Sequence, residues 1–501
     1  MPPILAIAIA LATRAVIPAL IVGIWSGVFL IDGPGVVSIW TSLLAFFDTY
    51  LVAAIADSDR VRVLLFTMML GGLIGIIAAN GGLRSFVEHV TRYASTARRG
   101  QLATAGLGLA IFFDDIANTL LIGKTMRPVA DRLRISREKL AYLVDSTAAP
   151  IAGIAFASTW VGYEVSVIES TVAGIADLDT PAYLIFLDAI PYSFYSILTL
   201  FMVFAVAWSG RDFGPMHEAE RLARAQVPVA EVTPAADEPT RGNASNALVP
   251  LAVCVVTLFA SLLITGSGDS FREIIGSADS YAALLWASLL GVLSACLITV
   301  WHRQLSLDAV MDAWVDGVRS TVYAVVILVL SWTLADVVKV LDTATFIIDS
   351  TRNALPIFLL PALSFLLGGV VAFSTGTSWG TMGVLMPLML PLAWTLLTDQ
   401  AAAGGPMELY IFHGAVAGVL AGAIWGDHCS PISDTTVLSS LATECVHIEH
   451  VRTQIPYAMT SGGCALLLCA IPVGLGVPWW LCLLVSGAAI LLILRWLGRP
   501  A

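Results

Sequence analysis

The sequence predicts an all-α polytopic membrane protein made of two inverted-topology repeats, and three observations support this prediction. The 501 residues are 58% hydrophobic and only 12% charged, with a mean hydropathy of +0.87, whereas soluble domains carry about 25% charged residues. Long apolar segments recur along the chain, and their number predicts roughly 11–13 spans of ~20 residues each. In each half, two of these segments are interrupted by polar residues in the same order.

Composition also excludes several classes of protein. The net charge is −11, and the chain has no basic patch of the kind that binds nucleic acid. Seven cysteines lie without regular spacing, which argues against a disulfide framework. We find no nucleophile–base arrangement and no cofactor motif, so we expect neither an enzyme nor a bound cofactor.

The first repeat is expected at residues 1–208. Residues 4–30 form either one kinked span or a short helix followed by a full one, and more spans follow, which favours a first helix over a cleaved signal. Residues 40–56 are more amphipathic and are expected partly in the interface, whereas residues 61–79 are long enough to cross.

Residues 101–123 are apolar, but acidic and amide side chains interrupt their centre. Four arginines precede this segment and six basic residues follow it within residues 124–139. Basic flanks favour the cytoplasmic side, and one crossing cannot place both flanks there. The pattern therefore predicts a re-entrant helical hairpin with its tip at residues 113–119, lining a protein cavity.

The first repeat continues with a broken transmembrane helix. Residues 140–161 are expected as a span interrupted between Asp145 and Pro150, because proline disrupts helix hydrogen bonding. Residues 183–208 form another span. Residues 209–246 are polar and lack hydrophobic periodicity, which predicts a linker that divides the protein near its midpoint.

The second repeat, residues 247–501, begins with three expected spans, at residues 247–264, 281–300 and 321–340. Residues 355–397 are then a long apolar stretch with a polar tip at residues 373–380. Basic residues are scarce on its flanks, so we expect a second re-entrant hairpin that enters from the opposite side of the membrane.

A second broken helix is predicted within residues 411–441, before final spans at residues 457–473 and 478–497. It contains the run Gly426-Asp427-His428-Cys429-Ser430-Pro431-Ile432-Ser433-Asp434-Thr435-Thr436. Corresponding interrupted segments in two halves indicate a secondary-transporter binding site near the bilayer midplane.

The interrupted segments share oxygen-bearing side chains, and broken helices expose unpaired backbone groups beside them. Ionisable groups at membrane depth indicate function, and small hard cations prefer oxygen ligands. The candidate cation- and proton-binding residues are Asp114, Asp115, Asn118, Asp145, Ser146, Thr147, Ser374, Thr375, Thr377, Ser378, Asp427, Ser430, Ser433, Asp434 and Thr435. The carboxylates expected to contact Na⁺ are Asp114, Asp145, Asp427 and Asp434.

Several carboxylates in one poorly hydrated cavity cannot all be ionised while the cavity is empty. A proton and a sodium ion would therefore compete for the same oxygens. This competition, combined with alternating exposure of the site, is sufficient for exchange.

The acidic and hydroxyl residues also have structural interpretations. Asp114 and Asp115 could cap a helix at the surface, and Asp145 could cap a half-helix through its side chain. The hydroxyls of residues 374–378 could serve close helix packing in the membrane.

The remaining polar residues favour structural interpretations as well. His428 and Cys429 follow Asp427 directly, but consecutive residues point in different directions, which favours a packed or hydrogen-bonded histidine over a zinc ligand. Residues 445–450, with cysteine and histidine at ligand-like spacing, are interpreted as a solvated turn. Glu164, with Glu169 and Asp188, is interpreted as a loop or structural group.

Three motifs together resemble the NhaC-type sodium/proton antiporter family of the ion transporter superfamily. They are residues 112–119 (Phe-Phe-Asp-Asp-Ile-Ala-Asn-Thr) with Met126-Arg127-Pro128, residues 145–151 (Asp-Ser-Thr-Ala-Ala-Pro-Ile), and the run at residues 426–436. The resemblance covers most of the chain. It implies a multi-pass antiporter of the bacterial inner (plasma) membrane that exchanges Na⁺ for H⁺ in the lipid bilayer, with two inverted repeats.

The resemblance leaves an alternative open. Members similar to this family are also assigned malate/lactate exchange or amino-acid transport, so a Na⁺- or H⁺-coupled organic solute transporter stays the second hypothesis. The candidate segments carry no basic residue, which argues against an anionic substrate. A passive channel is disfavoured because paired discontinuous segments suit alternating access. A homodimer is left open as an assembly state.

Overall fold

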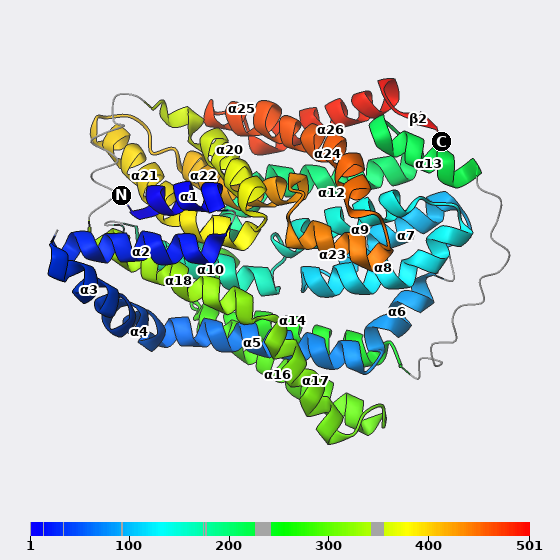
Figure 1. The fold of residues 1–501 in the computed structure, drawn as a ribbon, viewed down its shortest axis with the longest axis horizontal. Coiled ribbons are helices and arrows are strands. Elements are labelled where there is room, and N and C mark those ends of the chain that lie inside the picture. The colour runs from blue at the N-terminus through cyan, green and yellow to red at the C-terminus, as the bar shows by residue number, and fades with distance from the viewer. Residues whose placement is uncertain are drawn as a thin grey trace.

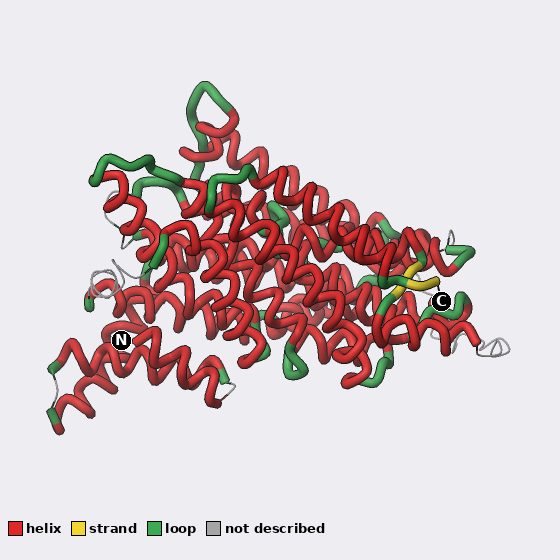
Figure 2. The backbone as a smooth tube through the Cα atoms, turned by 90° about the horizontal axis from the view of Figure 1, so that it is seen from above, coloured by secondary structure: helices red, strands yellow, loops and turns green. Residues whose placement is uncertain are grey.

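The computed structural model describes residues 2–13, 15–33, 35–91, 94–173, 175, 178–225, 242–341 and 355–500. This part of the chain is almost entirely helical, apart from a short antiparallel ribbon of β1 (Arg211–Asp212) and β2 (Arg499–Pro500). Most helices lie side by side along the long axis of the molecule (Figures 1 and 2). Helices α5, α16 and α17 lie on one side of this bundle and α25 and α26 on the opposite side (Figure 1).

The helices of the first half are α1 (Pro2–Thr13), α2 (Val16–Asp32), α3 (Val36–Ala45), η1 (Phe46–Leu51), α4 (Val52–Ala56), α5 (Ser58–Ala79), α6 (Gly82–Thr91), α7 (Ala97–Ala110), α8 (Asp115–Arg132), α9 (Arg137–Ala152), α10 (Thr159–Val172), α11 (Ala182–Ala189), η2 (Ile190–Tyr192), α12 (Phe194–Ser209) and α13 (Gly214–Ala225). Of the two alternatives for residues 4–30, the structure has the short helix α1 followed by the longer α2.

The helices of the second half are α14 (Ser245–Thr265), α15 (Phe271–Ser277), α16 (Ser280–Trp301), α17 (Leu307–Ser320), α18 (Val322–Val340), η3 (Ile357–Leu359), α20 (Leu360–Thr375), α21 (Ser378–Ala402), α22 (Leu409–Cys429), α23 (Asp434–Thr443), α24 (His447–Cys464), η4 (Ala465–Ala470), α25 (Ile471–Gly474) and α26 (Trp479–Trp496).

Within the described residues, ten helices are long and apolar enough to cross a membrane. An eleventh span results if α11 with η2 and the following α12, which are bent by 47° relative to each other, are counted as one. A helical, multi-pass membrane protein is thereby confirmed.

Helices α7 and α8 meet at a short non-helical segment, residues 111–114, inside the segment expected as a hairpin. Thr96 begins α7 by accepting a hydrogen bond from the backbone of Arg99, and Asp114 begins α8 by accepting one from Ala117 N at 2.7 Å. Such side-chain caps satisfy backbone donors that the first helical turn leaves unpaired. The two helices pack against each other and against α9.

The predicted break between Asp145 and Pro150 is wrong in its position. These residues lie inside α9, which continues to Ala152 before Gly153 ends it. Pro150 removes one backbone donor, but the helix continues for two more residues beyond it. The non-helical segment is residues 153–158, and Ser158 then caps α10.

The second half also has a hairpin-like pair and a broken helix. Helices α20 and α21 meet at Gly376, whose φ of +70° favours glycine. A Cβ at Gly376 would lie 2.5 Å from the Ile432 carbonyl oxygen, so this turn also requires close backbone approach. Ile432 lies in residues 430–433, the break between α22 and α23 that contains Pro431.

Helices α20 and α22 pack along their length. A Cβ added to Gly426 of α22 would lie 2.1 Å from the Gly369 carbonyl oxygen of α20, a distance that real side chains do not reach. Small residues permit this closeness in membrane proteins. The packing places the break after α22 beside the end of α20.

Part of the expected linker, residues 209–246, is ordered as β1 and α13. Residues 226–241 lie outside the described residues.

Candidate functional site

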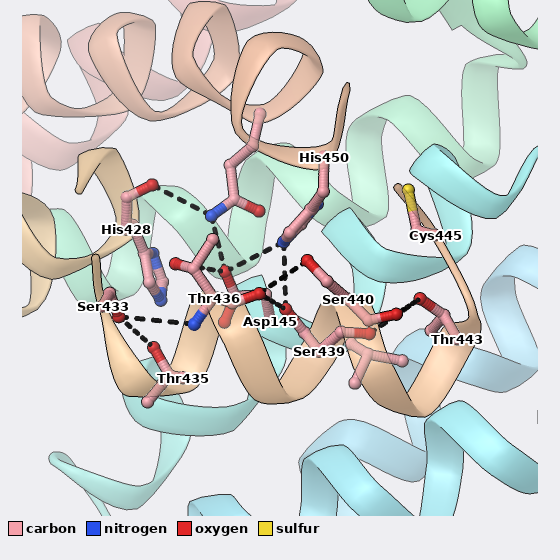
Figure 3. A network of polar contacts seen from close by, with 12 residues as sticks. Asp145, His428, Ser433, Thr435, Thr436, Ser439, Ser440, Thr443, Cys445 and His450 are labelled. Atoms are coloured by element: carbon pink, nitrogen blue, oxygen red, sulfur yellow. Dashed lines mark hydrogen bonds and ion pairs between the residues drawn. The ribbon is translucent and has the colours of Figure 1, made fainter. Parts of the chain in front are cut away.

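Asp145 of α9 lies at the centre of a buried polar network (Figure 3). Its Oδ2 accepts a hydrogen bond of 2.6 Å from Gln454 Nε2 and one of 3.4 Å from Thr436 Oγ1. His450 Nε2 lies 3.4 Å from the same oxygen. Oδ1 has no partner in the described part of the chain. Helices α9, α23 and α24 therefore hold a carboxylate that is 0% exposed.

Asp427 is a second buried carboxylate, near the C-terminal end of α22, and is 1% exposed. Its Oδ2 accepts a hydrogen bond of 2.9 Å from Thr435 Oγ1, and that hydroxyl also lies 3.0 Å from Ser433 Oγ. Oδ1 again lacks a partner among the described residues. Asp427 interacts electrostatically with Asp145 and Asp434.

Asp114 and Asp115 lie where α7 and α8 meet. Asp114 caps α8, and its Oδ2 accepts a hydrogen bond of 3.1 Å from Thr159 Oγ1 of α10. Asp115 is only 7% exposed and interacts electrostatically with Asp114, Asp145 and Asp434. Asp434 itself is exposed at the first turn of α23. Carboxylates from both halves of the chain are therefore close enough to interact.

The Asn118 side chain holds the first helix pair together. Asn118 Nδ2 donates to the carbonyls of Gly108 and Ile111 at 2.8 and 3.0 Å, and to that of Thr147 at 3.4 Å. The Thr147 hydroxyl donates to the Leu143 carbonyl within its own helix. Ser146 beside it is buried. The amide of Asn118 thus fastens α8 to α7 and α9.

The hydroxyls of the second helix pair bond to backbone. Ser374 and Thr375 each donate to the carbonyl four residues earlier, Thr377 caps α21, and Ser378 donates to the Ala423 carbonyl at 3.4 Å. Within the described residues, none of the four is hydrogen-bonded to a site carboxylate.

Two serines organise the break between α22 and α23. Ser430 Oγ donates to the Phe373 carbonyl at 2.7 Å, which ties the break to the end of α20. Ser433 caps α23 by accepting a hydrogen bond of 3.3 Å from Thr436 N. These contacts set the position of Thr435 against Asp427.

His450 and Gln454 were missed as site residues, and the interpretation of residues 445–450 as a solvated turn is wrong. Helix α24 begins at His447, and His450 is fully buried, 3.0 Å from Ser439 Oγ as well as beside Asp145. His450, Gln454 and Tyr457 are spaced by four and three residues, which places them on one helical face. That polar stripe was the available signal.

His428 is a buried, hydrogen-bonded histidine, which agrees with the interpretation that was favoured over a zinc ligand. Its Nδ1 lies 2.9 Å from the hydroxyl of Tyr195 of α12, and its carbonyl accepts a bond of 3.0 Å from Gln454 Nε2. The imidazole therefore braces the helix end that carries Asp427.

The arrangement suits binding of a proton or a small cation. Asp145 and Asp427 each keep one unpartnered oxygen, and in the described chain neither is ion-paired with a lysine or arginine. Burying charges without compensation is costly. Occupation by a proton or a cation removes this cost.

Comparison with known proteins identifies the family. The model of the Na⁺/H⁺ antiporter family matches residues 151–472. A Haemophilus influenzae protein described as uncharacterized is 31% identical over 468 residues, covering 92% of this chain and 87% of its own length. The malate-2H⁺/Na⁺-lactate antiporter of Bacillus subtilis is 37% identical over 100 residues, which cover 20% of this chain and 18% of that protein.

A solved structure shares the fold. The Alcanivorax borkumensis YdaH transporter superposes with a TM-score of 0.55 at 17% identity, covering 87% of this chain and 90% of that one. Since the family model matches well over half of the residues, the chain belongs to the Na⁺/H⁺ antiporter family.

Proposed function

We propose that this protein is a secondary antiporter that exchanges Na⁺ for H⁺ at the acidic site around Asp145 and Asp427. The observation that carries the proposal is that these two buried carboxylates interact and that each has an oxygen without a partner in the described chain. Carboxylate oxygens are suitable ligands for a hard cation. Since a proton on either group removes the charge that attracts Na⁺, the two ions exclude each other.

Other groups near these carboxylates complete the proposed binding site. Thr435 already donates to Asp427, and its oxygen could turn to a bound cation together with backbone carbonyls of the break after α22. Asp114, Asp115 and Asp434 add negative charge around the site. We therefore propose that they attract the cation and that Asp145 and Asp427 bind it.

The proposed mechanism is alternating access by two inverted repeats, residues 1–208 and 247–501, in the bacterial inner membrane. In both halves two helices meet at a short non-helical segment, α7 with α8 and α20 with α21, and the pair is followed by a helix that carries a buried aspartate, Asp145 in α9 and Asp427 in α22. The opposite charge bias of the flanks supports opposite orientation of the two hairpins.

An organic-solute antiporter is the second candidate. It is favoured by the local similarity to a Bacillus subtilis protein that exchanges malate with protons for lactate with Na⁺. One observation argues against this candidate. Among the described residues, the polar network around Asp145 contains hydrogen-bonded histidines but no arginine or lysine that could bind an organic anion.

Proteoliposomes with an imposed pH gradient test the proposal. Addition of Na⁺ is expected to collapse the gradient with the natural protein and to leave it intact with Asp427→Asn or Asp145→Asn. Asp308→Asn, an exposed carboxylate of α17, is the control and should exchange normally. If Na⁺ leaves the gradient unchanged while malate, lactate or an amino acid is transported, the second candidate replaces the first.

A further inference from the structure

Glu164 is a buried carboxyl group that the acidic site does not use. The sequence predicted a loop or structural group, whereas the structure places Glu164 in the middle of α10, where it is 0% exposed. Neither Oε1 nor Oε2 has a hydrogen-bond partner in the described chain. Asp145 and Asp427, by contrast, each have one oxygen bonded to neighbouring side chains.

The surroundings of this carboxyl disfavour a negative charge. A Cβ at Gly153 would lie 3.3 Å from Glu164 Oε1, 3.4 Å from the Ala149 carbonyl oxygen and 3.2 Å from Ile424 Cδ1. Glu164 therefore faces the C-terminal end of α9, where the helix dipole is negative, and an apolar side chain of α22.

No cation compensates the carboxyl within the described residues. Helices α5, α9, α11, α18 and α21 pack against α10. The cationic side chains of these helices bond elsewhere: Arg60 to Asp336, Arg62 to Asp279, Arg137 to Asp131, Lys139 to Asp212, and Lys339 to the Ala173 carbonyl.

Titratable groups of α10 and of the described helices packed against it do not pair with Glu164 either. Tyr163, its neighbour in α10, is coupled to it electrostatically, but its hydroxyl donates to the Trp379 carbonyl of α21. Asp145 of α9 is held by His450 and Gln454. The hydroxyl of Tyr183 of α11 donates to the Phe156 carbonyl.

We propose that Glu164 is a proton-binding site separate from the acidic site, with its side chain holding a proton in this conformation. An ionised carboxylate buried without partners is far more costly than a neutral carboxyl group. The proton can leave only after water or a cation reaches the side chain. That this proton contributes to exchange rests on the proposed function, whereas its binding does not.

Infrared spectroscopy of the full-length protein in lipid nanodiscs tests this site. At neutral pH, the spectrum of the natural protein is expected to contain a protonated-carboxyl C=O band that is weaker in both Glu164→Gln and Glu164→Leu. Glu169→Gln, a partly buried glutamate of the same helix, is the matched control and should retain the band. Raising the pH should remove the Glu164 contribution reversibly.

The outcomes separate this proposal from the proposed function. Identical carboxyl bands in the natural protein and in both Glu164 variants would overturn the proton site, even if Na⁺/H⁺ exchange is observed. A lost band without any Na⁺-driven proton movement would support the proton site and remove the proposed function. Glutamine and leucine both lack a titratable carboxyl group, so the test needs only one of the two Glu164 variants to fold.

Discussion

Asp145 of α9 and Gln454 of α24 are joined by a hydrogen bond of 2.6 Å between residues separated by 309 positions in the chain. Gln454 also donates to the His428 carbonyl at 3.0 Å, next to Asp427. One amide group therefore contacts both of the segments that carry the buried carboxylates, and it sets the distance between them.

Replacing this amide should affect stability and transport together. Gln454→Leu leaves the Asp145 carboxylate without its shortest donor, and loss of a donor to a buried group costs about 1–3 kcal/mol. We expect a lower unfolding temperature and a roughly ten-fold slower exchange, which corresponds to about 1.4 kcal/mol. Thermal unfolding and the vesicle assay measure the two effects. Gln304→Leu, in a turn after α16, is the control, and equal effects in both variants would contradict the role of Gln454.

The buried ion pair of Lys139 and Asp212 should stabilise the end of α9 that lies far from its break. Both side chains are almost completely buried, and the Tyr457 hydroxyl donates to Asp212 at 2.7 Å. Lys139→Met leaves a buried charge uncompensated, which costs about 3–5 kcal/mol. In denaturant unfolding, Lys139→Met with Asp212→Asn should regain part of this loss. If the double variant is no more stable than the single one, the pair does not contribute as described.

Glu220 of α13 should make stability depend on pH. Burial raises the pKa of its carboxyl group, and this effect outweighs the opposite effect of the nearby Lys139. Glu220 Oε1 also accepts a hydrogen bond of 2.7 Å from Ser136 N. The folded state then binds the proton more tightly than the unfolded state, so the stabilisation present at low pH is lost as pH rises through the raised pKa.

Comparing the natural protein with Glu220→Gln measures how much Glu220 contributes to the pH dependence of stability. Unfolding temperatures recorded from the ordinary glutamate range upward should fall more steeply in the natural protein than in the variant, because glutamine does not titrate. Parallel curves for the two proteins would show that Glu220 has the same pKa folded and unfolded.

A side chain at Gly376 should be destabilising because of the positive φ and because of the close contact with Ile432, and Gly210 is a control for the first effect alone. Gly376→Ala combines a positive φ with a Cβ 2.5 Å from the Ile432 carbonyl oxygen, and we expect a loss of about 2 kcal/mol or more. Gly210→Ala has a similar φ of +62° but open space around its Cβ, and should cost about 1 kcal/mol. Thermal unfolding of the two variants compares them, and an equal loss would mean that the contact with Ile432 is unimportant.

The sequence was sufficient to predict those features that depend on local chemistry. Composition predicted a helical membrane protein, and the polar residues within the apolar run 101–123 predicted a break between two helices, where Asp114 caps α8. The break near Pro431 was expected because the proline lies within a run of polar residues, and the structure has it at residues 430–433. The break near Pro150 was misplaced because a single proline does not decide where a helix ends.

The long-range contacts could not be read from local patterns. His450 and Gln454 reach Asp145 only because α24 packs against α9, and nothing in residues 445–454 alone indicates that partner. Residues 374–378 have the composition of a binding site, yet Ser374, Thr375 and Ser378 donate to backbone carbonyls and Thr377 accepts from a backbone N–H group. Composition alone cannot distinguish these two uses.

The tight packing of α20 on α22 limits how the molecule can change shape. With the backbones at Gly369 and Gly426 too close for even a methyl group, sliding one helix along the other would first require pulling them apart. In the proposed alternating access, α20 and α22 are therefore expected to move as one rigid unit, and Asp427 with them.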